Sequence, residues 1–268
     1  MKGIRLIGFL LFIVAVAKAQ NYNSESIPAS LKNRANAVIR DCKTVVDMRS
    51  PANVLINISK AVTVMNKGGD IHGQLVLFYD KNISIKSVKG EIYDEFGKQT
   101  GKLSLGNLKD ESAVNDFSLF EDSRVKYYIP QINTYPYTIV YQYEIRNKQN
   151  LIIPQWRPVP GFDVAVEKSS YQFVSNPKDE VRVYATNYKG DPEEIENENQ
   201  KSLAWKVEGV NAIKHEVYSP NQESYFTAIK VAPKNFSYYN FKGNYTDWEG
   251  LGKLSYDYLL KDRRLLPL

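Results

Sequence analysis

The chain has 268 residues, and its 35 lysines and arginines against 30 aspartates and glutamates give a formal net charge of +5. Because basic and acidic residues are interspersed, the sequence lacks the electrostatic footprint of a nucleic-acid-binding protein. Cys42 is the single cysteine, which excludes an intramolecular disulfide. A chain of this length can bury a substantial core, in one large β domain or two smaller ones.

Residues 1–19 have the pattern of a secretory signal peptide. A positive start (Lys2, Arg5), an apolar run and the small-residue site Ala-Lys-Ala predict cleavage between Ala19 and Gln20. An uncleaved membrane anchor is the alternative, but the apolar run is short of the ~20 residues that a spanning helix needs. We therefore expect an exported protein, in the periplasm, at the cell surface or secreted, without membrane contact after the signal is removed.

The first half of the mature chain shows strand patterns separated by turns. Residues 20–36 start as a polar stretch, which predicts a flexible leader. Residues 37–48 and 53–65 alternate apolar side chains and predict two antiparallel strands. Residues 74–79 fit either a strand or a helical turn, residues 83–93 and 101–105 fit a hairpin, and residues 108–116 are polar and irregular.

Residues 137–146 form the clearest strand and are expected to lie at the centre of a sheet. Over ten residues, one face is mainly apolar and aromatic and the other is mixed. The dipeptide Tyr135-Pro136 supplies a turn directly before it.

The second half continues the β pattern. Residues 151–153 predict a brief strand closed by Pro154, and further strands are expected at residues 164–174, 180–184, 202–207 and 225–232. The acidic stretch 191–199 fits either a calcium site or a solvated hairpin tip. It lacks the ligand spacing of a calcium-binding loop, which favours the hairpin tip.

The pattern changes at the end of the chain. Thr246 and Glu249 are spaced as a capping box, and apolar residues follow at helical spacing. We predict a helix from Asp247 to Leu260 that packs against the sheet by a stripe including Trp248.

These elements predict a mainly β fold with antiparallel pairing throughout, a β-sandwich with one C-terminal helix. The predicted organisation is a signal peptide (1–19), a leader (20–36), a sandwich domain (37–242) and a helical segment (243–268).

Several short motifs occur in a characteristic order. They are residues 118–128 (SLFEDSRVKYY) and 135–139 (YPYTI), supported by 91–98 (EIYDEFGK), 154–158 (PQWRP), 166–170 (VEKSS), 213–216 (IKHE) and 218–220 (YSP). The chain from about Asn36 to its end resembles the family known as domain of unknown function 3857. The resemblance implies an immunoglobulin-like or enlarged sandwich, found in exported proteins of Gram-negative bacteria in front of a transglutaminase-like domain. The catalytic Cys, His and Asp of that domain would lie beyond residue 268.

Catalytic motifs are missing from the sequence, and no metal or cofactor site is predicted. Cys42 is either a nucleophile or a small apolar residue on a strand, and the second interpretation is favoured because His72 and His215 cannot be paired with it. Glu121 and Asp122 could serve a glycosidase as paired acids, but neighbours on a strand point to opposite faces. A hydrated turn is the simpler interpretation.

Aromatic residues indicate a binding site more strongly than these polar residues do. Trp156 lies in a proline-bracketed loop, and Tyr127 and Tyr135 are in the central motif, so these three are candidates for binding a sugar ring or a peptide. The alternative is that the tyrosines fill half-buried sheet surfaces and that Trp156 covers the edge of a core.

The sequence leaves three functions open. The first is a non-catalytic exported accessory domain that positions or presents substrate to a transglutaminase- or protease-like partner domain, in cis or in trans. The second is a stand-alone carbohydrate- or peptidoglycan-binding protein that uses exposed aromatic residues. The third is a hydrolase with an unfamiliar site. The first predicts an interaction surface next to the C-terminal helix, the second an aromatic patch away from it, and the third a deep pocket of convergent polar groups.

Overall fold

A computed structural model describes residues 21–113, 122–238, 241–244 and 247–261. The predicted signal peptide with its cleavage site at Ala19 and Gln20, motif residues 118–121 and Thr246 lie outside these residues. None of the helices in the described part has both the length and the apolar character needed to span a membrane.

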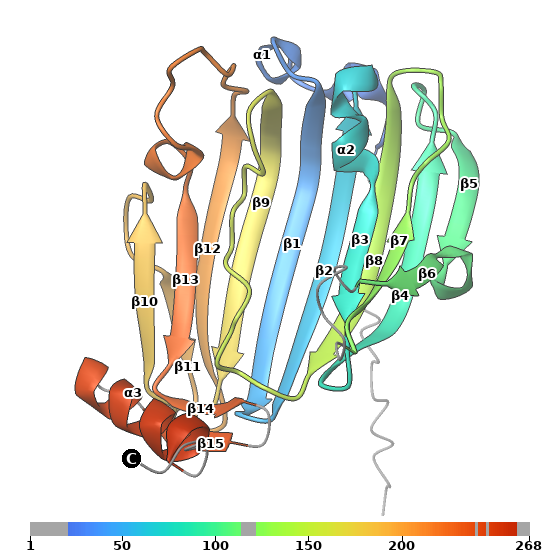
Figure 1. The fold of residues 1–268 in the computed structure, drawn as a ribbon. Coiled ribbons are helices and arrows are strands. Elements are labelled where there is room, and N and C mark those ends of the chain that lie inside the picture. Colours follow the sequence, from blue (N-terminus) through green and yellow to red (C-terminus); the bar gives the residue numbers. More distant parts are fainter. Residues whose placement is uncertain (1–20, 114–121, 239–240, 245–246, 262–268) are drawn as a thin grey trace, which may run out of the picture.

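One eight-stranded sheet spans the molecule (Figure 1). Its strands lie in the order β11-β12-β9-β1-β2-β8-β4-β5. Their bounds are β1 Ala37–Ser50, β2 Asn53–Val64, β4 Ile83–Tyr93, β5 Gln99–Ser104, β8 Tyr137–Asn147, β9 Val164–Ser175, β11 Glu193–Glu196 and β12 Lys201–Val210. Strand β8 is the one expected at the sheet centre. It lies inside the sheet between β2 and β4, but the two central strands of the order are β1 and β2.

The pairing of β1 with β9 departs from the expected antiparallel arrangement. These strands are parallel, with Ala37 opposite Val164 and Asp47 opposite Val174. The chain enters β9 from β8, which runs in the same direction as β1 because both are antiparallel to β2. Parallel strands need a crossover connection, and residues 148–163 provide it by running along β9 in front of the sheet (Figure 1). The prediction of antiparallel pairing throughout is therefore wrong at this place.

A second layer of two small sheets covers one face of the large sheet (Figure 1). One is the pair β10 (Val181–Thr186) and β13 (Ala228–Pro233), in front of β9 and β12. The other has the order β3-β7-β6, with β3 Leu75–Tyr79, β7 Arg124–Tyr128 and β6 Lys109–Ser112. A hairpin of β14 (Asn235–Tyr238) and β15 (Phe241–Asn244) lies near the C-terminal helix. The architecture is mainly β with a C-terminal helix, as predicted.

Two apolar cores lie between the layers, one beneath each small sheet. The first contains Leu75 and Leu77 of β3 with Ile139 and Tyr141 of β8. The second contains residues of β13, β9 and β12 together with Trp156. Because successive side chains of a strand point to opposite faces, the alternating apolar residues of β8 all face the first core.

Short helices occupy the connections. They are the 3-10 helices η1 Ser24–Ser26, η2 Lys67–Gly69, η3 Leu105–Asn107 and η4 Gln222–Ser224, and the α-helices α1 Ala29–Lys32 and α2 Asp70–Gly73. The chain ends with α3 (Trp248–Ser255), which continues into the π-helix η5 (Tyr256–Leu260).

The segment expected to be a flexible leader is ordered instead. Ile27 and Leu31 are buried against Val38 of β1 and Ala165 of β9, which point away from the two main cores. The N-terminal segment thus covers one end of the opposite face of the sheet. Its polar composition concealed the few apolar residues that anchor it.

The C-terminal helix forms at the predicted residues but packs differently. Its N-cap is Asp247, whose side chain accepts a hydrogen bond from the Gly250 amide at 2.8 Å. Leu254 lies close to Gly243 of β15, where an added Cβ would meet the leucine at 2.8 Å. Trp248 is 84% exposed, so the prediction that Trp248 packs against the sheet is wrong.

Three other local predictions differ from the structure. Residues 151–153 form no strand, residues 109–112 form strand β6 within a stretch expected to be irregular, and residues 193–196 of the acidic stretch form strand β11. The undecided residues 75–79 form strand β3.

Candidate functional site

Trp156 is buried and does not offer an exposed aromatic face. Its side chain is 4% exposed, its ring stacks on that of Tyr171 with centroids 6.2 Å apart, and its Nε1 donates to Ser169 Oγ at 3.1 Å. Its backbone exchanges two hydrogen bonds of 3.0 Å with Ile229 of β13. The interpretation of Trp156 as a ligand platform is therefore wrong, and the residue holds the crossover segment against the second core.

Tyr127 and Tyr135 are half-buried and lie in different places. Tyr127 is on β7, where its hydroxyl donates to Glu111 Oε1 at 2.5 Å. Tyr135 donates to both carboxylate oxygens of Asp70 in α2, each at 2.9 Å. The structure does not bring these tyrosines together with Trp156, so the three predicted residues form no common site.

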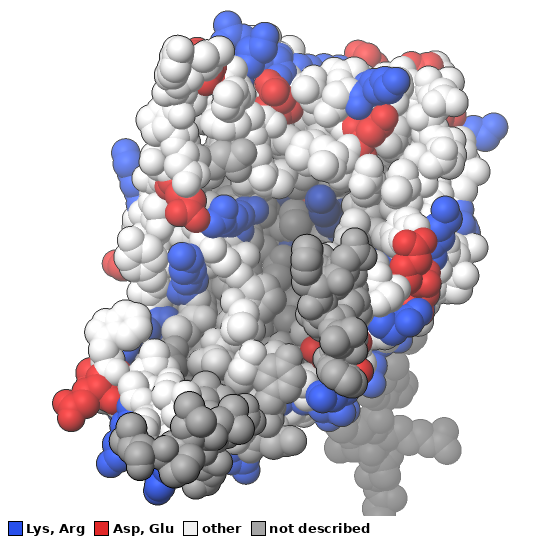
Figure 2. All heavy atoms as spheres, in the orientation of Figure 1, with Lys and Arg blue, Asp and Glu red and all other residues white. Residues whose placement is uncertain are grey.

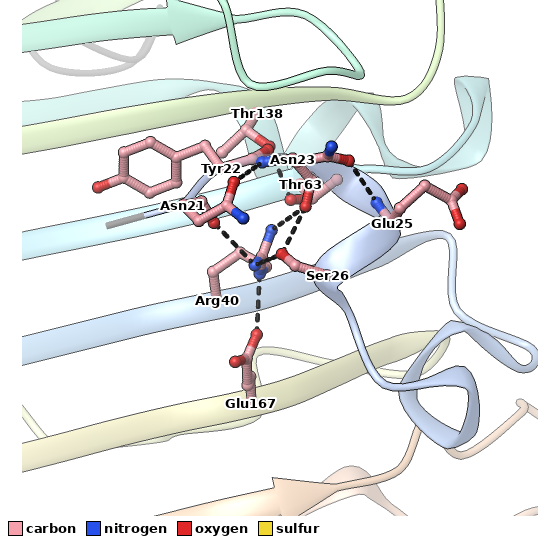
Figure 3. A network of polar contacts seen from close by, with 9 residues as sticks. All are labelled: Asn21, Tyr22, Asn23, Glu25, Ser26, Arg40, Thr63, Thr138 and Glu167. Atoms are coloured by element: carbon pink, nitrogen blue, oxygen red, sulfur yellow. Dashed lines mark hydrogen bonds and ion pairs between the residues drawn. The ribbon is translucent and has the colours of Figure 1, made fainter. Parts of the chain in front are cut away.

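The N-terminal segment is held by a buried arginine that sequence analysis missed (Figure 3). Arg40 is 6% exposed, and its Nε pairs with Glu167 Oε2 at 2.8 Å. Its other guanidinium nitrogens donate to Ser26 Oγ at 2.7 Å and to the carbonyl oxygens of Asn21 and Asn23 at 3.2 and 3.4 Å. Four acceptors around one guanidinium use most of its donors, so this network serves to fasten the segment.

The middle of the covered face lies between the two small sheets and is hollowed (Figure 2). Five half-buried side chains from three adjacent strands, which we call the cleft floor, lie between the cores. They are Cys42 and Thr44 of β1, Ile58 and Lys60 of β2, and Tyr143 of β8. Strand register places Cys42 opposite Lys60, Thr44 opposite Ile58, and Ile58 opposite Tyr143.

The walls of this central cleft contact the floor through polar groups. On one side, Ser169 accepts from Trp156 and lies opposite Cys42 in the sheet. On the other side, Lys60 Nζ donates to the carbonyl oxygen of His72 in α2 at 3.5 Å, and the Tyr141 hydroxyl donates to the neighbouring Gly73 carbonyl at 2.7 Å. Helix α2 leads directly into β3, so Lys60 lies at the beginning of that strand.

Burial dominates the electrostatics of the cleft. It lowers the pKa of the Lys60 ammonium, and the 3.5 Å contact is its one hydrogen bond among the described residues. Burial also raises the pKa of the Cys42 thiol, the opposite of what an activated nucleophile requires. Burial, followed by the charge of Lys60, lowers the pKa of His72. Within the part of the chain that the structure describes, the cleft floor thus contains one ammonium group with a single long hydrogen bond and one thiol whose ionisation is disfavoured.

A signal for Lys60 was present in the sequence. The residues Val54, Ile56, Ile58, Val62 and Val64 share one face of β2, and Lys60 falls in phase with them. A lysine at an apolar position of an alternating strand indicates a buried charge or a site. Cys42 was harder to assign, because a bulge between Ile39 and Asp41 changes the phase of β1.

The remaining candidates from the sequence are scattered. His215 is exposed, with its ring 5.0 Å from that of Phe162. Asp122 is exposed and pairs with Lys81 at 3.7 Å, whereas Glu121 lies outside the described residues. Among the residues that the structure describes, no three His, Cys, Asp or Glu side chains are grouped to hold a metal ion.

A second surface feature lies on the C-terminal helix. Trp248, Tyr256 and Leu260 are 84%, 44% and 60% exposed. Trp248 is the first residue of α3, and Tyr256 and Leu260 are the first and last residues of η5. We call these three residues the helical patch.

Comparison with solved structures shows the same fold in a longer protein. A protein from Parabacteroides distasonis, provisionally classed as a protease, matches with a TM-score of 0.61 at 11% identity, over 76% of this chain and 41% of that chain. An M1 zinc metallopeptidase from Deinococcus radiodurans matches over 74% of this chain and 42% of that chain. Its TM-score of 0.35 at 8% identity is too low to indicate a shared fold. This chain therefore spans about two-fifths of the length of either protein.

Comparison with protein families gives a match over most of the sheet. No curated protein matches the chain. The family model described as a domain of unknown function with a solved structure, DUF3857, matches residues 52–214, which include the cleft residues of β2 and β8 and the Trp156 segment. This match agrees with the resemblance carried by the sequence motifs, and the chain belongs to the DUF3857 family.

Proposed function

We propose that the chain is an exported, non-catalytic accessory domain that docks against a transglutaminase- or protease-like domain and positions or presents its substrate. The observation that carries the proposal is the helical patch. Its three large side chains are exposed on α3 and η5, the last two described elements of the chain. Large apolar side chains exposed near one another on a protein surface are typical of protein contact sites.

The comparisons support this role through the fold alone. The P. distasonis protein shares this fold over 41% of its own length and is provisionally classed as a protease. In that protein the fold is therefore one part of a larger polypeptide. The sequence analysis expected an accessory domain to have an interaction surface next to the C-terminal helix, and the helical patch lies there.

The burial of Trp156 removes the main support for a stand-alone sugar-binding protein, because that hypothesis needed its ring at the surface. The exported location rests on the signal-peptide pattern at the N-terminus.

The first experiment is to read the genomic DNA downstream of the codon for Leu268 and in the adjacent genes. We expect a transglutaminase- or protease-like domain, encoded in the same frame or next to it. That domain is then produced separately and its affinity for this chain is measured by calorimetry.

Variants of the patch test the docking surface. Trp248→Ala combined with Leu260→Ala should weaken binding of that domain by about tenfold or more, as expected for apolar anchors of an interface. The matched control is Phe96→Ala, since Phe96 is 72% exposed in the turn between β4 and β5 and should leave the affinity unchanged. Equal affinities for both variants, or no such domain in either position, would contradict the proposal.

A further inference from the structure

We propose that the central cleft binds an extended peptide segment that carries a carboxylate. Lys60 receives the carboxylate, and the edge of β3 that no described strand occupies pairs with the peptide backbone. This inference deepens the proposed presentation of substrate, because it gives the substrate class, but it uses a surface separate from the helical patch. The two proposals can therefore fail independently.

The charge of Lys60 identifies the chemistry of the ligand. A desolvated ammonium is costly unless a partner compensates it. None of the described carboxylates forms an ion pair with Lys60, and its hydrogen bond to the His72 carbonyl oxygen is long, at 3.5 Å. The Lys60 residue is half-buried and belongs to the cleft floor. A carboxylate entering from the hollow would provide the missing charge and acceptor.

The edge of β3 identifies the shape of the ligand. Strand β3 is the terminal strand of the order β3-β7-β6, and no described strand pairs with its other edge. In Figure 1 strand β3 lies in front of the large sheet, and this edge faces the middle of the molecule. Unpaired backbone groups along a strand edge are a template for an added strand.

The opposite wall is also extended backbone. Trp156 pairs with Ile229 as an antiparallel bridge, so the crossover segment already acts as a short strand beside β13. An added strand between this segment and β3 would lie over the cleft floor. The apolar groups of Ile58 and Tyr143 would contact its inward side chains, while Lys60 would contact an acidic one.

These features favour a peptide over a small anion. A small anion would use Lys60 alone and would leave the edge of β3 and the apolar part of the floor without a role. A strand-forming segment uses all three, and alternate side chains of a strand reach the floor at the spacing of Ile58 and Lys60.

The experiment is to pan a phage-displayed library of random octapeptides on the full chain. The wild type should enrich peptides with Asp or Glu at one position. Lys60→Met should lose that enrichment, because it keeps a long apolar side chain and removes the charge. Lys43→Met is the matched control: Lys43 lies opposite Ser59, on the other face of the same strands, and should select the same peptides as the wild type.

The best peptide then gives a measurement that needs no protein variant. Replacing its Glu by Gln should weaken binding to the wild type by about tenfold to a hundredfold, the range for hydrogen bonds to charged groups. The same replacement should have little effect on Lys60→Met. Peptides without a preferred acidic position, or unaffected by the Glu to Gln change, would overturn the assignment of Lys60, even if Lys60→Met fails to fold.

Two further readouts test the geometry. Two peptides test the pairing, one N-methylated at the odd-numbered residues and one at the even-numbered residues. Only one of the two should lose binding, since only alternate amides face β3. Bound peptide should also slow the reaction of Cys42, the single cysteine, with dithionitrobenzoate. Binding that tolerates both methylation phases, or leaves Cys42 equally reactive, would place the peptide elsewhere. The patch variants Trp248→Ala and Leu260→Ala should bind the peptide as the wild type does.

Discussion

At the scale of single residues, two tryptophans have exposures opposite to those predicted from the sequence. Trp156, expected at the surface, is 4% exposed, and Trp248, expected in a core, is 84% exposed. Both lie near turns or chain ends, where neighbouring residues say little about what covers a side chain. The consequence is a clear difference in their contributions to stability.

Trp156→Ala should lower the free energy of unfolding by about 3–5 kcal/mol, because it removes a large buried ring and the hydrogen bond to Ser169. Trp248→Ala should change it by about 0.5 kcal/mol or less. Urea unfolding of both variants beside the wild type measures the two effects. Equal losses, or a larger loss for Trp248→Ala, would contradict the structure.

Arg40 gives a second prediction at this scale. Arg40→Met should cost about 2–4 kcal/mol of unfolding free energy, because Glu167 loses its partner and the N-terminal segment loses its anchor. The cost is below that of a fully buried pair because the Glu167 side chain is 28% exposed.

The control for Arg40 is Arg49→Met. Arg49 is 57% exposed and pairs with Asp47 at 2.9 Å, and its loss should cost no more than about 1 kcal/mol. Limited proteolysis adds a local readout, since cleavage within residues 21–28 should accelerate in Arg40→Met alone. Resistance equal to the wild type would show that the segment is held by other contacts.

At the scale of elements, a charged cluster ties together the three strands of the small sheet β3-β7-β6. Asp110 of β6 accepts from Lys126 Nζ at 2.7 Å, from the Tyr79 hydroxyl at 2.8 Å and from Arg124 Nε at 3.1 Å. These donors, Lys126 first, lower the pKa of Asp110 to about 2 from its ordinary value of 3.8.

The lowered pKa predicts an acid dependence. The folded carboxylate stays ionised at a pH where the unfolded chain already binds a proton, so its contribution is full above about pH 4 and is lost as the pH falls toward 2. The stability difference between wild type and Asp110→Asn should therefore be constant from pH 5 to 7 and shrink below pH 4. Unfolding curves across this range measure the stability difference. A difference that grows below pH 4 would contradict the predicted direction.

Strand β11 shows how tertiary context converts a polar stretch into a sheet edge. Lys201 of β12 pairs with Glu194 at 2.6 Å and with Glu196 at 3.5 Å across the hairpin. Charged side chains on an edge strand discourage pairing with another molecule. The same acidic composition that predicted a solvated tip is thus compatible with a short exposed strand.

At the scale of the whole molecule, strand order sets the pattern of local stability. Strands β1, β2 and β8 have neighbours on both sides and pack beneath the second layer, whereas β11 is an edge strand. Backbone amides of the central strands should exchange with deuterium most slowly, and those of β11 fastest among the strands of the large sheet. Exchange in β1 as fast as in β11 would contradict this topology.

Much of the fold follows from local patterns. The alternation of β2 and β8, the hairpin of β4 and β5 and the position of the C-terminal helix could all be predicted, because each depends on residues close in sequence. The candidate site could not. Cys42 and Lys60 come from different strands, and the bulge in β1 decides whether the thiol faces the cleft.

The sequence by itself determined a mainly β chain with the motifs of the DUF3857 family, since strand periodicity and turn residues act locally. Only the tertiary structure decided which side chains are covered. It buried Trp156, exposed Trp248, anchored the N-terminal segment through Arg40 and left Lys60 at the floor of a cleft. The physical reason is that burial depends on the crossover of residues 148–163 and on the two small sheets, which meet the large sheet through contacts distant in sequence.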